Sequence, residues 1–214
     1  MKINNLVRKS ISEAMGVMIF VTSIVAASFN PTFHNLALAS TLAIMILLTS
    51  GVSGGHLNPA VSFFFFARKE INLSTLVAYW VAQLSGAALG LYLGFALSGT
   101  PVQAITAPAG IPANAVFIGE LMSTTILVII INRLASTKRA QLIPFAVGLW
   151  VLAASTFTLT CAQANPAVTF ALMLRDGFSQ GNLGIVLAEF AGALLALLYI
   201  LLLDDKVKKS KKKK

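Results

Sequence analysis

Long apolar segments separated by short polar stretches dominate the chain. A helix needs about 20 apolar residues to cross the roughly 30 Å apolar core of a bilayer. Two shorter apolar stretches, 58–67 and 165–174, would form helices about 15 Å long, which reach only half-way. We therefore predict an all-α integral membrane protein with six spanning helices and two half-helices. The predicted spans are Ile11–Ser28, Leu36–Val52, Leu73–Leu97, Ala115–Asn132, Leu142–Thr158 and Leu183–Leu203.

Three landmarks repeat at half the length of the 214-residue chain. The tripeptide Asn-Pro-Ala occurs at 58–60 and again 107 residues later, at 165–167. Glu13 and Glu120 share this offset, and the segment 82–87 resembles 188–193 at an offset of 106. We infer a tandem duplication, with a first repeat at 1–107, a second at 108–205 and a basic tail at 206–214. Each repeat has three spans, an odd number, so the second must be inverted relative to the first.

Each Asn-Pro-Ala is predicted to begin a half-helix. Asparagine is a preferred N-cap whose side-chain oxygen accepts from the first turn, and proline fits the first helical position because it lacks an N–H. The amide NH₂ group of each cap would then be free to face the space between the two half-helices. The residues of this predicted pore midplane are Asn58, Pro59, Ala60, Asn165, Pro166 and Ala167. Two positive helix ends would face the same point, which would admit neutral solutes and repel cations and protons.

Composition and charge support this arrangement. Hydrophobic residues make up 57% of the chain and charged residues only 11%, against about 25% in soluble domains. With the N-terminus in the cytoplasm, 15 of the 16 Lys and Arg residues fall on the cytoplasmic side, as the positive-inside rule requires. The C-terminal tail would also be cytoplasmic, as a solvated segment or in contact with anionic membrane lipids. Nucleic-acid binding is not expected, because no aromatic-rich basic domain accompanies the tail.

The motifs are similar to those of the aquaporin, or major intrinsic protein, family. The segment 53–61, Ser-Gly-Gly-His-Leu-Asn-Pro-Ala-Val, resembles the first family signature, and the segment 82–87 resembles its third helix. Glu13 and Glu120 match the glutamates that open its first and fourth helices, where we expect a structural role of accepting from the backbone before each half-helix. The resemblance covers nearly the whole chain. It implies a homotetramer with one pore in each subunit, passing water and small neutral solutes.

The second motif departs from the family pattern at the outer selectivity filter. Most members have an arginine after the second Asn-Pro-Ala, where this chain has Val168. Counting from the motifs places the other filter positions at Leu38, at Ala162 and at either Ala153 or Ser155. Such a filter lacks arginine, histidine and a clear aromatic side chain, so it should be wider and more apolar than that of a water-specific member.

The sequence is compatible with the permeation of several solutes. Some bacterial family members associated with arsenic resistance have a similar Ala-Asn-Pro-Ala-Val-Thr motif, so arsenite-like metalloid hydroxy acids join glycerol and urea as candidates besides water. Glycerol facilitators usually have an aspartate where Thr169 stands, which weakens a glycerol-specific interpretation. The short loops and the lack of targeting signals favour the plasma membrane of a bacterium, the inner membrane. The terminal lysines would alternatively fit a dilysine retrieval signal of a eukaryote.

Four further polar residues carry alternative interpretations. His56 would line the cytoplasmic vestibule or cap buried backbone, and Cys161 would face the pore or be buried as a small hydrophobe. Glu189, a carboxylate at membrane depth, has a structural or a pH-sensing interpretation. Arg175 beside Asp176 would form a solvated pair at the outer mouth or replace the missing filter charge.

Two other classes of function compete with a channel. A proton- or ion-coupled transporter can use inverted repeats and broken helices, but it needs a titratable or ion-binding cluster at the midplane, where these motifs supply neutral amides. An enzyme needs a metal-ligand cluster, a nucleophile–base set or a phosphate loop, and the sequence suggests none. We therefore expect neither enzymatic activity nor a bound cofactor or metal.

Overall fold

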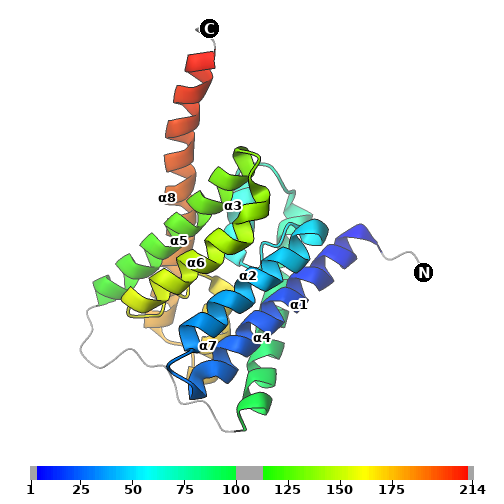
Figure 1. Ribbon diagram of the computed structural model, residues 1–214, viewed down its shortest axis with the longest axis vertical. Helices are drawn as coiled ribbons and strands as arrows, with labels where there is room; N and C mark the ends of the chain where they lie inside the picture. The colour runs from blue at the N-terminus through cyan, green and yellow to red at the C-terminus, as the bar shows by residue number, and fades with distance from the viewer. Residues whose placement is uncertain (1–3, 100–112, 212–214) are drawn as a thin grey trace.

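The computed structural model describes residues 4–99 and 113–211, with side chains to residue 203. Within these residues the fold is helical throughout, and six helices are long and apolar enough to cross a membrane (Figure 1). The chain is thus a multi-pass membrane protein, as predicted. The helices are α1 (Asn5–Ala26), α2 (His34–Ser53), α3 (Pro59–Ala67), α4 (Leu73–Ser98), α5 (Ala113–Ser136), α6 (Ile143–Phe157), α7 (Pro166–Asp176) and α8 (Gln180–Lys211), with short 3₁₀ turns at Ala27–Phe29 and Ala140–Leu142.

The duplication expected from the sequence reappears in the packing. In the first repeat α1 lies against α4, and in the second α5 lies against α8. Both pairs approach closely at a glycine. A Cβ atom on Gly86 of α4 would lie 2.3 Å from the backbone oxygen of Ala14, and one on Gly192 of α8 would lie 2.7 Å from that of Leu121. The small residues therefore allow backbone contact between helices, which membrane proteins use in place of a strong hydrophobic driving force.

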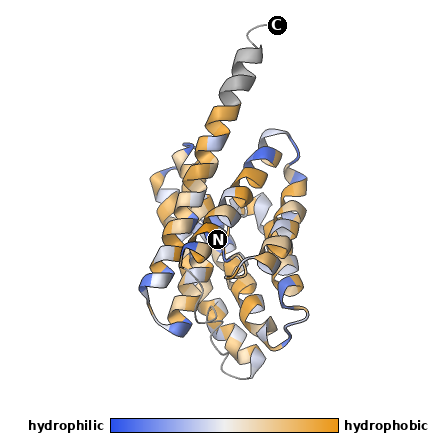
Figure 2. Ribbon diagram, turned by 90° about the vertical axis from the view of Figure 1, so that its left-hand side faces the viewer, coloured by the Kyte–Doolittle hydropathy of each residue, from blue (hydrophilic) through white to orange (hydrophobic). Residues whose placement is uncertain are grey.

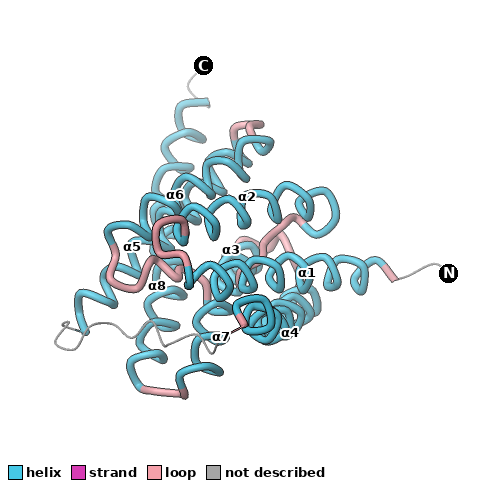
Figure 3. The backbone as a smooth tube through the Cα atoms, turned by 60° about the horizontal axis from the view of Figure 1, so that its bottom comes forward, coloured by secondary structure: helices cyan, strands magenta, loops and turns pink. Residues whose placement is uncertain are grey.

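The two short helices α3 and α7 are the predicted half-helices. Nine and eleven residues long, they are too short to span the membrane core. Irregular backbone precedes each of them, at Gly54–Leu57 and at Thr158–Ala164 (Figure 3). Each half-helix also packs on the other repeat, α3 on α8 and α7 on α4. The two repeats thus interlock, and the irregular segments are enclosed by the long helices.

The helix surfaces fit a lipid environment. Figure 2 shows mainly hydrophobic residues along the helices, whereas hydrophilic residues gather in the loops at the two ends of the bundle. Large apolar side chains such as Leu89, Leu149 and Leu187 are more than half exposed on the long helices. Water would disfavour such a surface, but a bilayer or a neighbouring subunit would not.

Several boundaries differ from those expected. Helix α1 begins at Asn5 because Asn4 caps it, accepting from the N–H of Leu6 at 2.8 Å, so the helix includes Arg8 and Lys9 before the apolar run. The loop 98–114, which the predicted third and fourth spans enclose and which carries no charged residue, lies largely outside the described residues. In the predicted tail, residues 206–211 continue the backbone of α8.

Candidate functional site

Asn58 and Asn165 cap the two half-helices with their side-chain oxygens. Asn58 Oδ1 accepts from the N–H groups of Ala60 at 2.8 Å and Val61 at 3.4 Å, and Asn165 Oδ1 accepts from that of Ala167 at 3.0 Å. Such a cap typically stabilises a helix by about 1 kcal/mol. Both asparagines are extended at the backbone and about 4% exposed.

The amide nitrogens of the two caps join the repeats to each other. Asn58 Nδ2 donates to the carbonyl oxygen of Ala164 at 2.7 Å, and Asn165 Nδ2 donates to that of Leu57 at 2.9 Å. The sequence predicts free amide groups, but each donates one hydrogen across the repeat boundary. An NH₂ group has two hydrogens, so one per asparagine is left for a solute. These bonds hold the N-terminal ends of α3 and α7 face to face.

Glu13 and Glu120 support the irregular segments that precede the half-helices. The carboxylate of Glu13 accepts from the backbone N–H groups of His56 at 3.0 Å and Leu57 at 2.6 Å. That of Glu120 accepts from those of Gln163 at 3.0 Å and Ala164 at 2.7 Å. A hydroxyl group also donates to each, Ser53 to Glu13 and Thr160 to Glu120. All of these partners correspond at an offset of 107, so the two repeats share this arrangement. Gln83 Nε2 additionally donates to Glu13 at 2.8 Å, a bond without a counterpart at Glu120 among the described residues.

The segments are also alike in backbone conformation, although their residues differ. Gly54 and Gly55 have φ angles of +96° and +62°, and Leu57 follows at +49°. The corresponding residues of the second repeat, Cys161, Ala162 and Ala164, have φ angles of +55°, +48° and +44°. Side-chain-bearing residues adopt this left-handed region at a cost of about 1–2 kcal/mol each. The glutamate bonds supply the constraint that holds them there.

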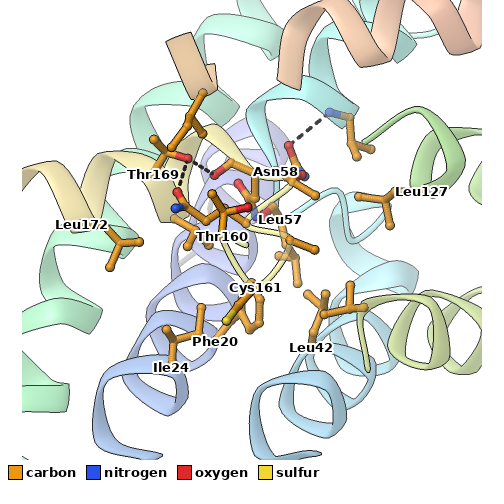
Figure 4. A pocket seen from close by; sticks show the side chains of 18 of the residues that line it. Phe20, Ile24, Leu42, Leu57, Asn58, Leu127, Thr160, Cys161, Thr169 and Leu172 are labelled. Carbon is orange, nitrogen blue, oxygen red and sulfur yellow. Dashed lines mark hydrogen bonds between the residues drawn. The ribbon is translucent and has the colours of Figure 1, made fainter. Parts of the chain in front are cut away.

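A cavity of about 1140 Å³ passes between the half-helices and the long helices. Its lining extends from Glu70 and Ile71, after α3, to Asp176 and Gly177, at the end of α7. Figure 4 shows Phe20 and Ile24 on one side, Leu42 and Leu127 on the other, and Asn58 near its centre. Most of the wall is therefore apolar, with polar groups along the irregular segments.

The structure places the predicted midplane residues in two groups. Asn58 and Asn165 line the cavity, whereas Pro59, Ala60, Pro166 and Ala167 are buried behind them. The carbonyl oxygen of Pro59 accepts from the indole N–H of Trp80 at 3.0 Å, which anchors the start of α3. The two asparagines are thus the part of the motifs that a solute would touch.

Of the predicted filter positions, Leu38, Ala162 and Val168 line the cavity. Ala153 and Ser155 do not, and α6 contributes Val147 and Val151 instead. Two residues correspond to about 200° around a helix, so Ala153 faces away from the side on which Val151 lies. Ser155 is 3% exposed, and its carbonyl oxygen accepts from the side chain of Asn35 at 3.3 Å. Counting from the motif did not find the valines.

Of three further residues that the sequence singled out, two line the cavity and one does not. His56 lines the cavity, stacked on Phe65 with ring centroids 4.6 Å apart. Cys161 lines it as well and is partly exposed. Arg175 is not among the lining residues: its side chain is only 4% exposed and forms two hydrogen bonds with Asp176, at 2.6 and 2.7 Å. The Arg175 side chain is therefore less exposed than expected, whereas Asp176 is exposed.

Because Cys161 is the single cysteine and lies on the cavity wall, a mercurial reagent should inhibit permeation. The bound metal would obstruct the cavity beside Ala162. Osmotic shrinkage of proteoliposomes before and after treatment measures the effect, and Cys161→Ser should remove it. Equal inhibition of the serine variant would place the modified group elsewhere.

Paired half-helix caps inside a bundle of six apolar helices, with a cavity between them, define a membrane channel built on an inverted repeat. The sequence pattern described as Major intrinsic protein matches residues 1–170. The chain therefore belongs to the major intrinsic protein family, a family of channels, and is a passive channel for water and small solutes.

Individual relatives agree with this assignment. Aquaglyceroporin AqpS of Rhizobium meliloti (strain 1021) is 29% identical over 213 residues, which cover 90% of this chain and 88% of that protein. Probable aquaporin TIP1-2 of Oryza sativa subsp. japonica is 34% identical over 173 residues, covering 77% of this chain and 68% of that protein. The X-ray structure of the aquaglyceroporin from Plasmodium falciparum has the same fold, with a TM-score of 0.74, 23% identity and coverage of 91% and 93%.

Proposed function

We propose that this channel conducts neutral solutes larger than water, in addition to water. The observation that carries the proposal is the outer part of the cavity, where Val168 follows the second Asn-Pro-Ala and Leu38 and Val151 also line the wall. These three side chains are apolar and carry no charge. A wide, apolar constriction lowers the barrier for a three-carbon polyol or a trihydroxy metalloid acid relative to a narrow, charged one.

The names of two relatives support a polyol among the solutes. AqpS of Rhizobium meliloti and a Toxoplasma gondii relative, 28% identical over 174 residues, are both described as aquaglyceroporins. Glycerol, urea and metalloid hydroxy acids share the necessary chemistry, because each is neutral, compact and rich in hydrogen-bonding groups. Glycerol is the test solute in the experiments proposed below.

Ion exclusion is proposed to depend on the midplane. The N-terminal ends of α3 and α7 meet there, and each carries a partial positive charge of roughly half an elementary unit. With no arginine after Ala167, these helix ends provide the main barrier to cations and protons. Asn58 and Asn165 each offer one N–H to a passing solute, while Glu13 and Glu120 keep the supporting backbone in place.

The distribution of charge supports a proposal for the orientation in the membrane. We propose that the N- and C-termini lie in the cytoplasm of a bacterium, because this orientation leaves only Arg175 of the 16 basic residues outside. The protein would then lie in the inner membrane as a homotetramer, with exposed apolar faces of the long helices contacting lipid and neighbouring subunits. The basic residues of 206–214 would lie near the anionic headgroups.

Passive conduction distinguishes the channel from a coupled transporter. In proteoliposomes, glycerol flux should follow its gradient, rise linearly with concentration and be unchanged by a protonophore, because no ion gradient is coupled to it. Radiolabelled glycerol uptake with and without an imposed pH gradient measures this. Accumulation of glycerol above its external concentration would contradict the proposal and favour a transporter that uses the carboxylate of Glu189.

A further inference from the structure

Each repeat contains a chain of three polar side chains that leads from a long helix to the cavity. In the first repeat, Gln83 Nε2 on α4 donates to Ser62 Oγ on α3 at 3.0 Å. Ser62 Oγ in turn lies 3.1 Å from Nδ1 of His56, which lines the cavity. Gln83 and Ser62 are fully buried, so only the last member of the chain is accessible to a solute.

The second repeat has an equivalent chain made of different residues. Glu189 on α8 corresponds to Gln83, Thr169 on α7 to Ser62, and Gln163 to His56. Thr169 Oγ1 lies 2.9 Å from Glu189 Oε1 and 2.7 Å from Gln163 Oε1. Glu189 and Thr169 are at most 1% exposed, whereas Gln163 is partly exposed and lines the cavity. Figure 4 shows Thr169 across the cavity from Leu127.

The bonds of Gln163 determine which of its atoms a solute meets. Its backbone N–H donates to Glu120, and its side-chain oxygen accepts from the Thr169 hydroxyl. Since a hydroxyl has one hydrogen, the contact between Thr169 Oγ1 and Glu189 Oε1 is then donated by the protonated carboxyl group of Glu189. Within the part of the chain that the structure describes, the amide nitrogen has no hydrogen-bond partner. Two N–H donors of Gln163 are therefore available on the irregular segment that lines the cavity.

We propose that Gln163 is a specificity-determining residue of the channel: its NH₂ group, positioned by Thr169 and Glu189, binds the hydroxyl or carbonyl oxygen of a neutral solute. The inference rests on the proposed conduction of such solutes. Glycerol must shed much of its hydration to pass an apolar wall formed by Leu38, Val151 and Val168, and an uncompensated hydroxyl raises its barrier. Water depends less on the amide, because it keeps hydrogen bonds to the water molecules before and behind it.

The test compares glycerol and water permeability in the same proteoliposomes by stopped-flow light scattering. Gln163→Met keeps the length of the side chain and removes its donors. It should lower the glycerol-to-water permeability ratio about two- to tenfold, the effect of one lost hydrogen bond. Thr169→Val removes the hydroxyl that positions the amide and should lower the ratio in the same direction. Thr169→Ser is the matched control, because Ser62 fills this place in the first repeat; it should keep the wild-type ratio.

The outcomes separate this inference from the function on which it rests. If the wild type passes water but no glycerol, the proposed function fails. If the wild type passes glycerol and Gln163→Met keeps or raises the ratio, Gln163 does not determine specificity and the inference is overturned. A lowered ratio in Gln163→Met with no change in Thr169→Val would overturn the positioning role of Thr169. If Thr169→Val also loses water permeability, the variant is misfolded. The result for Gln163→Met then decides whether Gln163 determines specificity.

Discussion

Val168→Arg should lower glycerol flux by on the order of tenfold or more, while water flux falls less. Val168 lies on the cavity wall one residue after Ala167, and the residue itself is only 3% exposed. An arginine would project a guanidinium with five donors into the cavity that Leu38 also lines, narrowing this cavity and adding a fixed charge. Both effects lower the flux of a larger solute, such as glycerol, more than the flux of water. Stopped-flow reswelling in glycerol and shrinkage in sucrose give the two fluxes.

Val168→Leu is the control for bulk without charge. It adds only one methylene group to the wall, so glycerol flux should fall far less than with arginine. If the arginine variant keeps the wild-type glycerol flux, then Val168 does not lie at the constriction and another part of the cavity limits the solute.

Asn58→Asp and Asn165→Asp should each lower neutral flux by about tenfold or more, or open the channel to cations. Each asparagine donates to a carbonyl oxygen of the other repeat, Asn58 at 2.7 Å and Asn165 at 2.9 Å. A carboxylate cannot donate, so two oxygens would face each other, and a buried charge without a partner costs about 3–5 kcal/mol. The negative charge also offsets the positive helix ends and attracts cations.

Glycerol flux and a potential-sensitive dye measure these two effects. Asn114→Asp is the matched control, since Asn114 lines the cavity at an exposed position of α5, away from the caps. This variant should keep wild-type flux and ion exclusion. Wild-type behaviour of both midplane variants would mean that solutes do not pass between the two caps.

The fold was predictable because its determinants are local and repeated. The apolar segments predict the six spans, and a ten-residue stretch that starts with Asn-Pro-Ala predicts each half-helix; the helices and the family membership confirm both. The offset of 107 between Glu13 and Glu120 also indicated a shared task before the structure gave their hydrogen bonds. The pore role of the motif residues stays a prediction.

Other features depend on contacts that no local pattern encodes. The bonds from Asn58 to Ala164 and from Asn165 to Leu57 exist because two segments far apart in sequence meet. On α6, the count from the motif crossed the irregular segment 158–164, where the chain has no helical spacing to count by, so it missed Val151.

Gln163, by contrast, could have been found from the sequence, because the repeat offset marks it. It lies 107 residues after His56, as Thr169 does after Ser62, and extending the comparison of the repeats would have aligned both chains of polar residues. What the sequence lacked was the direction of each side chain. Only the structure shows that Thr169 contacts Glu189 as well as Gln163.

The most direct test of the central claim is the permeability of the wild-type protein itself. Purified protein in proteoliposomes should raise both osmotic water permeability and glycerol or urea permeability above those of protein-free vesicles, in the absence of any ion gradient. Permeation by water alone, with glycerol, urea and a neutral metalloid acid all at the level of protein-free vesicles, would contradict the account of an open, apolar outer constriction around Val168.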